Sequence, residues 1–138
     1  MSLGYRYETG LSGVDWREMK TTLAADDFDN GRSPHEPQRS FESSFASVIA
    51  YADGRIVGTA RALSDGVCNA YVVDVWTFTP HRHRGVASAM LKSLEARLDG
   101  QHMALFSHDA AAFYKTLGYA EEQVGLSKVI GTWLRRQA

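Results

Sequence analysis

The segment from Val72 to Leu98 constrains the fold of this chain more than any other stretch of its sequence. An apolar run ends in an arginine-rich turn, and an amphipathic pattern with helical spacing follows directly. At the start of a helix, backbone N–H groups lack intrahelical acceptors, and the helix dipole adds about half a positive charge. This turn can therefore hold an anion such as a phosphate.

Two properties of the turn favour a pyrophosphate over a single carboxylate. A ligand can approach the backbone closely at Gly85 and Ala87, because neither residue carries a large side chain. Arg82 and Arg84 add forked donors and fixed positive charge. An ordinary strand-to-helix turn with solvated arginines explains the same local sequence equally well, because short glycine-containing anion loops are weak signals.

The length and composition of the chain limit the classes of protein that it can represent. Its 138 residues fit one domain over residues 1–138, of which residues 1–3 are left outside the argument. Lysine and arginine number 15 against 16 acidic residues, so the formal charge of −1 provides no general basic field for nucleic acid. Cys68 is the single cysteine, which excludes an internal disulfide and a cysteine-built zinc site.

We expect no metal centre and no membrane partner. The five histidines lack the helical spacing of a metalloprotease pair, and His81 and His83 are expected to be exposed in the turn. The sequence contains neither an apolar run of about 18 residues nor a charged-then-apolar N-terminal signal. Together with the single cysteine, these features predict a soluble, cytoplasmic protein.

The N-terminal half reads as one helix among antiparallel strands. Helical spacing predicts a helix from about Val14 to Ala25. Residues 26–40 are expected to form a loop, either a substrate lid or a plain connector, with a short helix over 38–44. An Asp-Gly turn predicts a hairpin in this region. The expected antiparallel strands cover residues 5–8, 47–51, 56–63 and 70–78.

The C-terminal half adds a crossover. The helix after the turn ends near Gly100, a strand is expected over 103–106, and Asp109 can cap a helix through Leu117. The order strand, helix, strand implies a right-handed crossover and parallel pairing of residues 72–78 with 103–106. The expected fold is an α/β fold of the α+β type: a single mixed, mostly antiparallel central sheet with flanking helices. Residues 125–134, followed by Arg135 and Arg136, form either a closing strand or a dimer edge.

Two motifs resemble one known family. The pattern from Arg82 to Ala87, Arg-x-x-Gly-x-Ala between a strand and a helix, resembles the acetyl-CoA pyrophosphate motif of the GNAT (Gcn5-related) N-acetyltransferase superfamily. Residues 112–119 resemble the second signature of that family, Phe-Tyr-x-x-x-Gly-Phe/Tyr. Two signatures in the right order are stronger evidence for the resemblance than either signature alone. The resemblance implies an acyl-CoA N-acyltransferase fold with splayed parallel strands at the cofactor site.

The resemblance also implies which residues hold acetyl-CoA. Backbone amides from Arg84 to Ser88 would bind the pyrophosphate, and the end of the preceding strand would meet the pantetheine and the acetyl group. Trp76 fits simple core packing equally well. The cofactor-binding residues expected on this basis are Val75, Trp76, Thr77, Arg82, Arg84, Gly85, Val86, Ala87, Ser88 and Tyr114.

Tyr114 and Asp74 are the candidate catalytic residues. A phenol with a pKa of about 10 can protonate a departing thiolate, and the resemblance places Tyr114 at the sulfur; a half-buried ring packed beside Phe113 is the alternative. Asp74 interrupts an apolar strand, where a carboxylate is expensive unless it is paired or functional. Asp74 could bind the ammonium or accept its proton through water, or it could form a buried ion pair with Arg61. A water relay without Asp74 remains open.

The sequence thus predicts an N-acetyltransferase. An amine of a small molecule, rather than of a peptide or protein, would attack the thioester of acetyl-CoA directly in a ternary complex. A covalent acyl-enzyme is disfavoured because Cys68 has no base partner in the sequence pattern. A noncatalytic CoA-sensing module and a nucleic-acid-binding protein are the alternatives, and the balanced charge argues against the latter. A homodimer is a further expectation.

Overall fold

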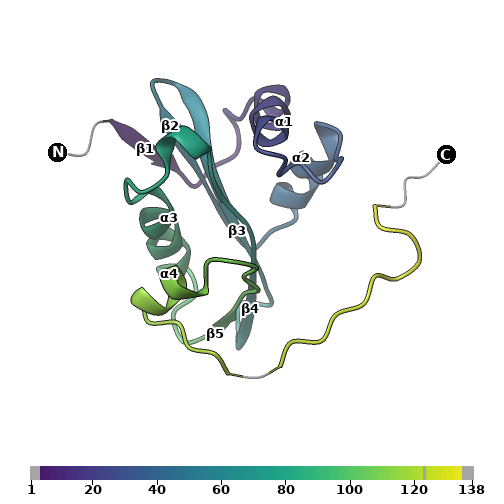
Figure 1. Ribbon diagram of the computed structural model, residues 1–138, viewed down its shortest axis with the longest axis vertical. Helices are drawn as coiled ribbons and strands as arrows, with labels where there is room; N and C mark the ends of the chain where they lie inside the picture. Colours follow the sequence, from purple (N-terminus) through teal and green to yellow (C-terminus); the bar gives the residue numbers. More distant parts are fainter. Residues whose placement is uncertain (1–3, 123, 135–138) are drawn as a thin grey trace. The chain divides into compact units, whose positions relative to one another are not determined.

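The computed structural model describes residues 4–122 and 124–134. The chain divides into an N-terminal unit that ends at Leu105 and a C-terminal unit that begins at Phe106 (Figure 1). The N-terminal unit is an α/β structure built on one five-stranded sheet. Its elements are β1 (Tyr5–Glu8), α1 (Trp16–Ala25), α2 (His35–Glu42), β2 (Ala46–Ala52), β3 (Arg55–Ser64), β4 (Asn69–Thr77), the 3₁₀ turn η1 (Thr79–His81), α3 (Val86–Glu95) and β5 (His102–Ala104).

The sheet has the order β1-β2-β3-β4-β5, antiparallel through β4 and parallel between β4 and β5. The expected mixed, mostly antiparallel sheet with flanking helices is therefore confirmed. The first helix begins two residues later than Val14, because Asp15 caps it by accepting the N–H groups of Arg17 and Glu18. The second helix lies within the expected loop and begins at His35, earlier than the expected residue 38.

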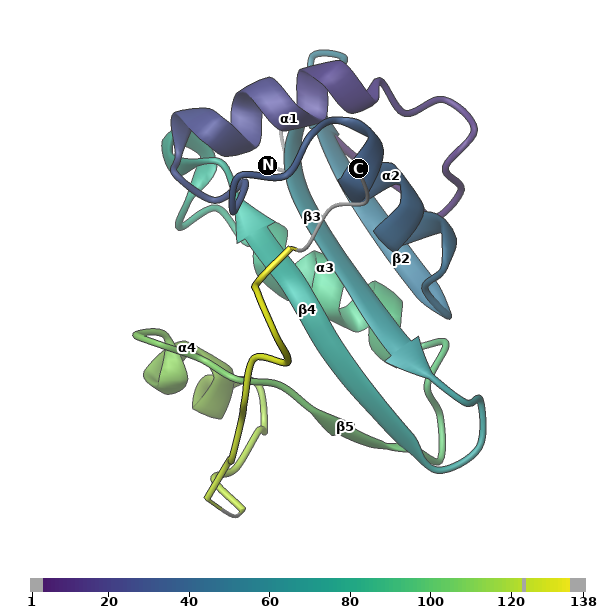
Figure 2. The same ribbon diagram turned by 90° about the vertical axis from the view of Figure 1, so that its right-hand side faces the viewer.

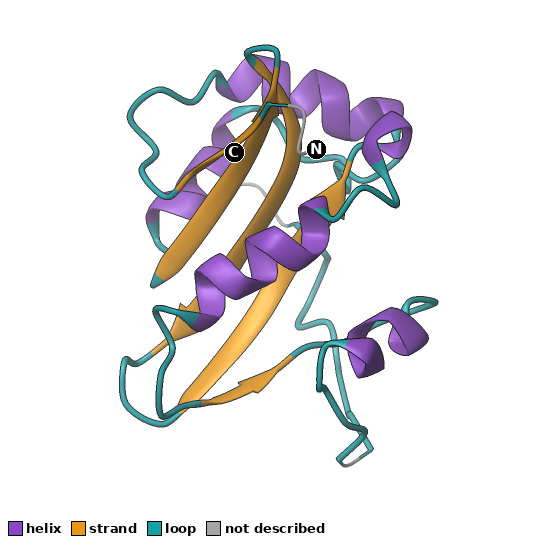
Figure 3. Cartoon of the chain, turned by 90° about the vertical axis from the view of Figure 1, so that its left-hand side faces the viewer, coloured by secondary structure: helices purple, strands orange, loops and turns teal. Residues whose placement is uncertain are grey.

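Helices cover both faces of the sheet, with α1 and α2 on one face and α3 on the other (Figure 3). On the α3 face, Gly58 permits close packing, because a Cβ there would lie 3.1 Å from the sulfur of Met90. On the opposite face, helix and strand side chains enclose an apolar core that includes an indole from β4. The buried members of this core are Met19, Leu23, Phe41, Ile49, Tyr51, Ile56 and Trp76.

The parallel pairing involves the first residues of β4, whereas the prediction placed it over residues 72–78. Asn69–Tyr71 pairs with His102–Ala104, and from Val72 to Thr77 no strand among the described residues pairs with β4 on that side. Phe106, which was expected within the strand, is 64% exposed and belongs to the other unit. Because β5 is so short, the two strands diverge and leave an open backbone edge on β4 (Figure 2).

In the described part of the C-terminal unit there is one short helix, α4 (Ala111–Thr116). Asp109 does not cap this helix; the Oγ atom of Ser107 instead accepts the N–H group of Ala110. Residues 124–131 form neither helix nor strand, so the prediction of a closing strand over 125–134 is wrong for the described residues. Arg135 and Arg136 lie outside the described residues.

Candidate functional site

The turn before α3 has the geometry of an anion-binding helix start. Gly85 is the N-cap residue with a φ of 81°, and no side chain caps the helix. Ala89 is the first residue whose N–H group bonds back to Gly85, at 3.0 Å, so the N–H groups of Val86, Ala87 and Ser88 have no acceptor within the helix. Of the backbone donors predicted from Arg84 to Ser88, those of Val86, Ala87 and Ser88 are therefore presented together at one helix start.

The two arginines of the turn have different environments. The Nε atom of Arg82 donates to the carbonyl oxygen of Thr77 at 3.2 Å, which anchors its side chain to the last residue of β4. Arg84 is exposed and has no hydrogen-bond or ion-pair partner among the described residues. Both arginines lie in the chain between the end of β4 and the start of α3.

The histidines of the turn also differ. His83 is exposed, as expected, with a φ of 63°. His81 is not freely exposed: its Nδ1 atom lies 2.7 Å from the Tyr5 hydroxyl, and its ring stacks on Phe78 at 6.4 Å between centroids. His81 therefore ties the turn to β1 and is unsuited to move toward a phosphate.

The carboxylate of Asp26, at the end of α1, holds the segment that leads from β4 into this turn. Asp26, the C-cap residue of α1, accepts hydrogen bonds from the indole N–H of Trp76 at 3.0 Å and from the backbone N–H of Thr79 at 3.0 Å. It also accepts the Thr79 hydroxyl at 2.9 Å. The end of α1 is thus bonded to both the end of β4 and the first residue of η1. No sequence signal joined residues so far apart in the chain.

The end of β4 combines core and open-edge residues. The Trp76 side chain is only 2% exposed and stacks on Phe28, so it is core packing, while its backbone lies on the open edge. Val75 is half-buried. The Oγ1 atom of Thr77 is the one buried side-chain polar atom without a hydrogen-bond partner among the described residues. An unpaired buried hydroxyl is costly, and it marks a place where a bound polar group would be stabilised.

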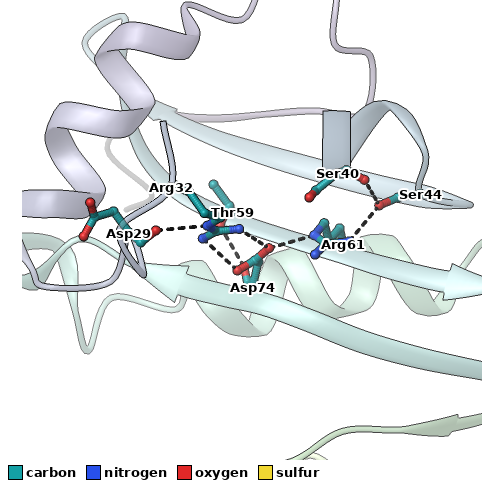
Figure 4. Close-up of polar contacts among 7 residues, drawn as sticks. All are labelled: Asp29, Arg32, Ser40, Ser44, Thr59, Arg61 and Asp74. Atoms are coloured by element: carbon teal, nitrogen blue, oxygen red, sulfur yellow. Dashed lines mark hydrogen bonds and ion pairs between the residues drawn. The ribbon is translucent and has the colours of Figure 1, made fainter. Parts of the chain in front are cut away.

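Asp74 lies in a β-bulge and is held by two arginines (Figure 4). The strand register shifts between Thr59 and Arg61, and Asp74 adopts a φ of 53°. Its carboxylate accepts two hydrogen bonds from Arg32, at 3.1 and 3.2 Å, and one from Nε of Arg61 at 2.7 Å. The ion pair with Arg61 weighed in the sequence analysis is therefore present. Arg32 was missed, because nothing in a polar loop indicates which strand it contacts.

The environment of Asp74 makes its carboxylate a weak base. Burial raises its pKa, but the hydrogen bonds and charges of Arg32 and Arg61 outweigh this effect and hold the pKa below its ordinary value. All three side chains are largely buried, with exposed fractions of 7, 13 and 10% for Arg32, Arg61 and Asp74. We therefore regard Asp74 as a structural anion rather than a proton acceptor.

Tyr114 lies on α4 of the C-terminal unit. Its ring makes edge contacts with Phe113, at 5.2 Å between centroids, and with Tyr119, at 5.8 Å. The packing alternative for Tyr114 is therefore also present. Burial raises the pKa of its phenol, which keeps the hydroxyl protonated at neutral pH. A protonated phenol is the form that an acid catalyst requires.

Other kinds of site receive no support from the described residues. Cys68 is exposed in a turn in which Asp65 accepts its backbone N–H group. No group of three or more His, Cys, Asp or Glu side chains in the described chain could hold a metal ion. None of the described helices is long and apolar enough to cross a membrane.

The geometry of the sheet and of the turn matches a known class of acyltransferase. The model of the acetyltransferase (GNAT) family matches residues 15–119, which include α1, the strands from β2 onward, the turn before α3, and α4. The chain therefore belongs to the GNAT acetyltransferase family, whose members use acetyl-CoA. No curated protein matches the sequence.

Solved structures share this fold over nearly the whole chain. A protein from Xanthomonas campestris pv. campestris assigned to the GNAT family is 25% identical, with a TM-score of 0.79 over 96% of this chain and 98% of that chain. An aminoglycoside acetyltransferase from an uncultured soil metagenomic sample is 23% identical, with a TM-score of 0.69 over 93% and 99%. Glucosamine-6-phosphate N-acetyltransferase from Arabidopsis thaliana is 13% identical, with a TM-score of 0.72 over 93% and 99%.

Proposed function

We propose that this protein transfers the acetyl group of acetyl-CoA to a primary amine of a small molecule in a ternary complex. The observation that carries the proposal is the uncapped helix start at Gly85, at the end of a strand with an open backbone edge. Two structurally similar proteins are named for the acetylation of small molecules, glucosamine-6-phosphate and aminoglycosides. This supports a small-molecule acceptor over a peptide or protein.

The residues of the turn fit the cosubstrate. The N–H groups of Val86, Ala87 and Ser88 would bind the pyrophosphate, with the positive charge of Arg82 and Arg84 beside them. The backbone of Val75, Trp76 and Thr77 on the open edge of β4 would pair with the amides of the pantetheine arm. The buried Thr77 hydroxyl would gain a partner.

The chemistry is a direct transfer. The neutral amine nitrogen attacks the thioester carbonyl, the C–N bond forms, and the C–S bond breaks. The amine proton leaves to water rather than to Asp74, because the hydrogen bonds from Arg32 and Arg61 make this carboxylate a weak base. Deprotonating a lysine-like amine at pH 7 costs roughly 4 to 5 kcal/mol. Tyr114 is proposed to donate its proton to the departing thiolate.

A thermal-unfolding scan with acetyl-CoA, CoA, ATP and NADPH at equal concentrations tests the cofactor assignment. A ligand at about 100 times its dissociation constant adds roughly 2.7 kcal/mol, which raises the melting temperature by several degrees. We expect stabilisation by acetyl-CoA and CoA only. The variant Gly85→Glu should lose this stabilisation, because it puts negative charge against the pyrophosphate. Gly85→Gln has similar bulk and backbone strain without the charge, and should retain part of it.

Turnover separates an enzyme from a CoA sensor. Release of the CoA thiol with a panel of amines, measured for the wild type and for Tyr114→Phe, should show acetylation that the variant slows without abolishing. Acetyl-CoA binding without turnover of any amine would favour the noncatalytic alternative. Stabilisation that is equal in the wild type and in Gly85→Glu would place the cosubstrate elsewhere.

A further inference from the structure

We propose that the acceptor is an amine that also carries an anionic group, a carboxylate or a phosphate, and that Arg61 recognises this group. The inference rests on the proposed acetyltransferase function and assigns the acceptor class. It starts from the cluster of Arg32, Asp74 and Arg61 on the face of the sheet that α1 and α2 cover (Figure 4). This cluster combines two guanidinium groups with one carboxylate.

The charge balance of the cluster disfavours a bare ammonium ligand. Both oxygens of Asp74 accept hydrogen bonds from guanidinium groups, so its negative charge is already neutralised. The second guanidinium leaves the cluster with a net positive charge at low exposure, where electrostatic interactions are screened least. Such a cluster attracts an anion. It also lowers the pKa of a nearby amine, which favours the neutral nucleophile.

Arg61 has donors left for a ligand, whereas Arg32 does not present a free nitrogen. The Nε, Nη1 and Nη2 atoms of Arg32 all donate within the protein. In Arg61, Nε donates to Asp74 and Nη1 donates to Ser44 at 3.4 Å, while Nη2 has no partner among the described residues. The Arg61 side chain is 13% exposed, against 7% for Arg32.

Arg61 is held in place for recognition. Its guanidinium group lies 5.7 Å from the centre of the Phe41 ring, in addition to its bonds to Asp74 and Ser44. Ser44 is itself fixed, because its hydroxyl donates to the carbonyl oxygen of Ser40 at 2.8 Å. A guanidinium fixed on several sides loses little entropy when it binds a carboxylate or a phosphate through its remaining edge.

An apolar surface lies beside this cation. Arg61 pairs with Val73 across the strands, and two residues further along β3 Leu63 pairs with Tyr71. Residues directly opposite, and residues two apart in a strand, share one face of a sheet. Leu63 is 39% and Tyr71 41% exposed. The surface offers an apolar contact next to an anion-binding donor, beside the strand proposed to hold the acetyl-CoA arm.

Matched amine pairs test this assignment. One pair is leucine and leucinamide, which differ in the carboxylate; the other is phosphoethanolamine and ethanolamine, which differ in the phosphate. We expect kcat/KM for the anionic member of at least one pair to exceed that for its neutral partner by about 10-fold, the value of one charged hydrogen bond. The pair that responds identifies the anion. Leucinamide has the less basic amine, so a preference for leucine would run against intrinsic reactivity.

Variants then connect the preference to Arg61. Arg61→Gln should reduce the ratio to near one by raising KM for the anionic amine, and Arg61→Lys should retain part of it. Acetyl-CoA binding by each variant confirms that the fold and the cosubstrate site are intact. Arg6→Gln is the matched control, because Arg6 also lies over an aromatic ring, that of Tyr51 at 4.5 Å, but on β1.

The outcomes separate this inference from the proposed function. If neutral amines are acetylated as well as anionic ones, or if Arg61→Gln keeps the preference, the acceptor assignment is wrong and the acetyltransferase assignment stands. If acetyl-CoA binds but the anionic amines are neither acetylated nor bound to the CoA complex, the acceptor assignment is also wrong. Absence of acetyl-CoA binding would overturn the proposed function itself.

Discussion

The turn before α3 and the Asp74 cluster both concentrate arginine, yet they use it in opposite ways. In the turn, Arg84 is exposed, and the backbone N–H groups after Gly85 have no acceptor within the helix. In the cluster, Arg32 is buried and every one of its side-chain nitrogens is bonded. A site that binds a charged cosubstrate from solvent needs unpaired donors, whereas a buried bulge needs its donors satisfied. Arginine therefore serves binding in the turn, whereas in the cluster Arg32 serves rigidity and only Arg61 keeps a donor for a ligand.

The largest expected difference between the two regions is in stability. Asp74→Ala leaves two guanidinium groups buried without their anion, and we expect it to lower the free energy of unfolding by about 3–5 kcal/mol. Arg84→Gln changes an exposed side chain and should remain within about 0.5 kcal/mol of the wild type. Urea unfolding of the three proteins measures both effects. Equal losses would mean that the cluster does not hold the bulge.

The two regions also differ in how far the sequence predicted them. Arg82, Gly85 and Ala87 are close in the chain, so helical period and small residues sufficed to place an anion site between a strand and a helix. The bond between Arg32 and Asp74 joins a loop to a strand, and single-sequence periodicity contains no information on such a contact. Most strands and helices could be predicted for the same reason, because the hydrophobic periods that mark them are local in the sequence.

The errors arose where tertiary contacts override local pattern. The apolar run Met103–Phe106 was interpreted as one strand, but pairing ends at Ala104 and Phe106 is exposed. Residues 125–134 contain apolar side chains suited to a strand, and the described part of this segment forms none. A strand exists only where a neighbouring edge supplies hydrogen bonds, which composition alone does not specify.

Asp26 joins the end of α1 to the end of β4 and to η1, and its substitution should have an intermediate effect. Asp26→Ala removes the acceptors of the Trp76 indole N–H and of the Thr79 backbone N–H and hydroxyl, at a cost of about 1–3 kcal/mol in stability. As a positioning residue for the turn, it should also weaken acetyl-CoA binding several-fold. Asp27→Asn is the control, because Asp27 is exposed and its φ of 55° suits asparagine. Isothermal titration with CoA measures the affinity of both variants; unchanged affinity in Asp26→Ala would limit Asp26 to a structural role.

The smallest expected effect is a pH dependence confined to the buried cluster. The pKa of Asp74 in the folded protein lies below its ordinary value of 3.8, because Arg32 and Arg61 outweigh the effect of burial. The unfolded chain therefore takes up this proton at a higher pH than the folded protein. The stabilisation is complete above the unfolded pKa and is lost as the pH falls through the folded pKa.

The comparison of wild type with Asp74→Asn isolates this contribution from the other carboxylates. Urea unfolding at pH 7, 4 and 3 should show a stability advantage of the wild type that is constant down to about pH 5 and shrinks below about pH 4. The exposed turn contains no carboxylate, so Arg84→Gln should run parallel to the wild type over the same range. A wild-type advantage that stays constant to pH 3 would show that the pKa of Asp74 is the same in the folded and the unfolded protein. An advantage that grows as the pH falls from 7 to 4 would show that Asp74 is neutral in the folded protein, with the two arginines held by hydrogen bonds without an ion pair.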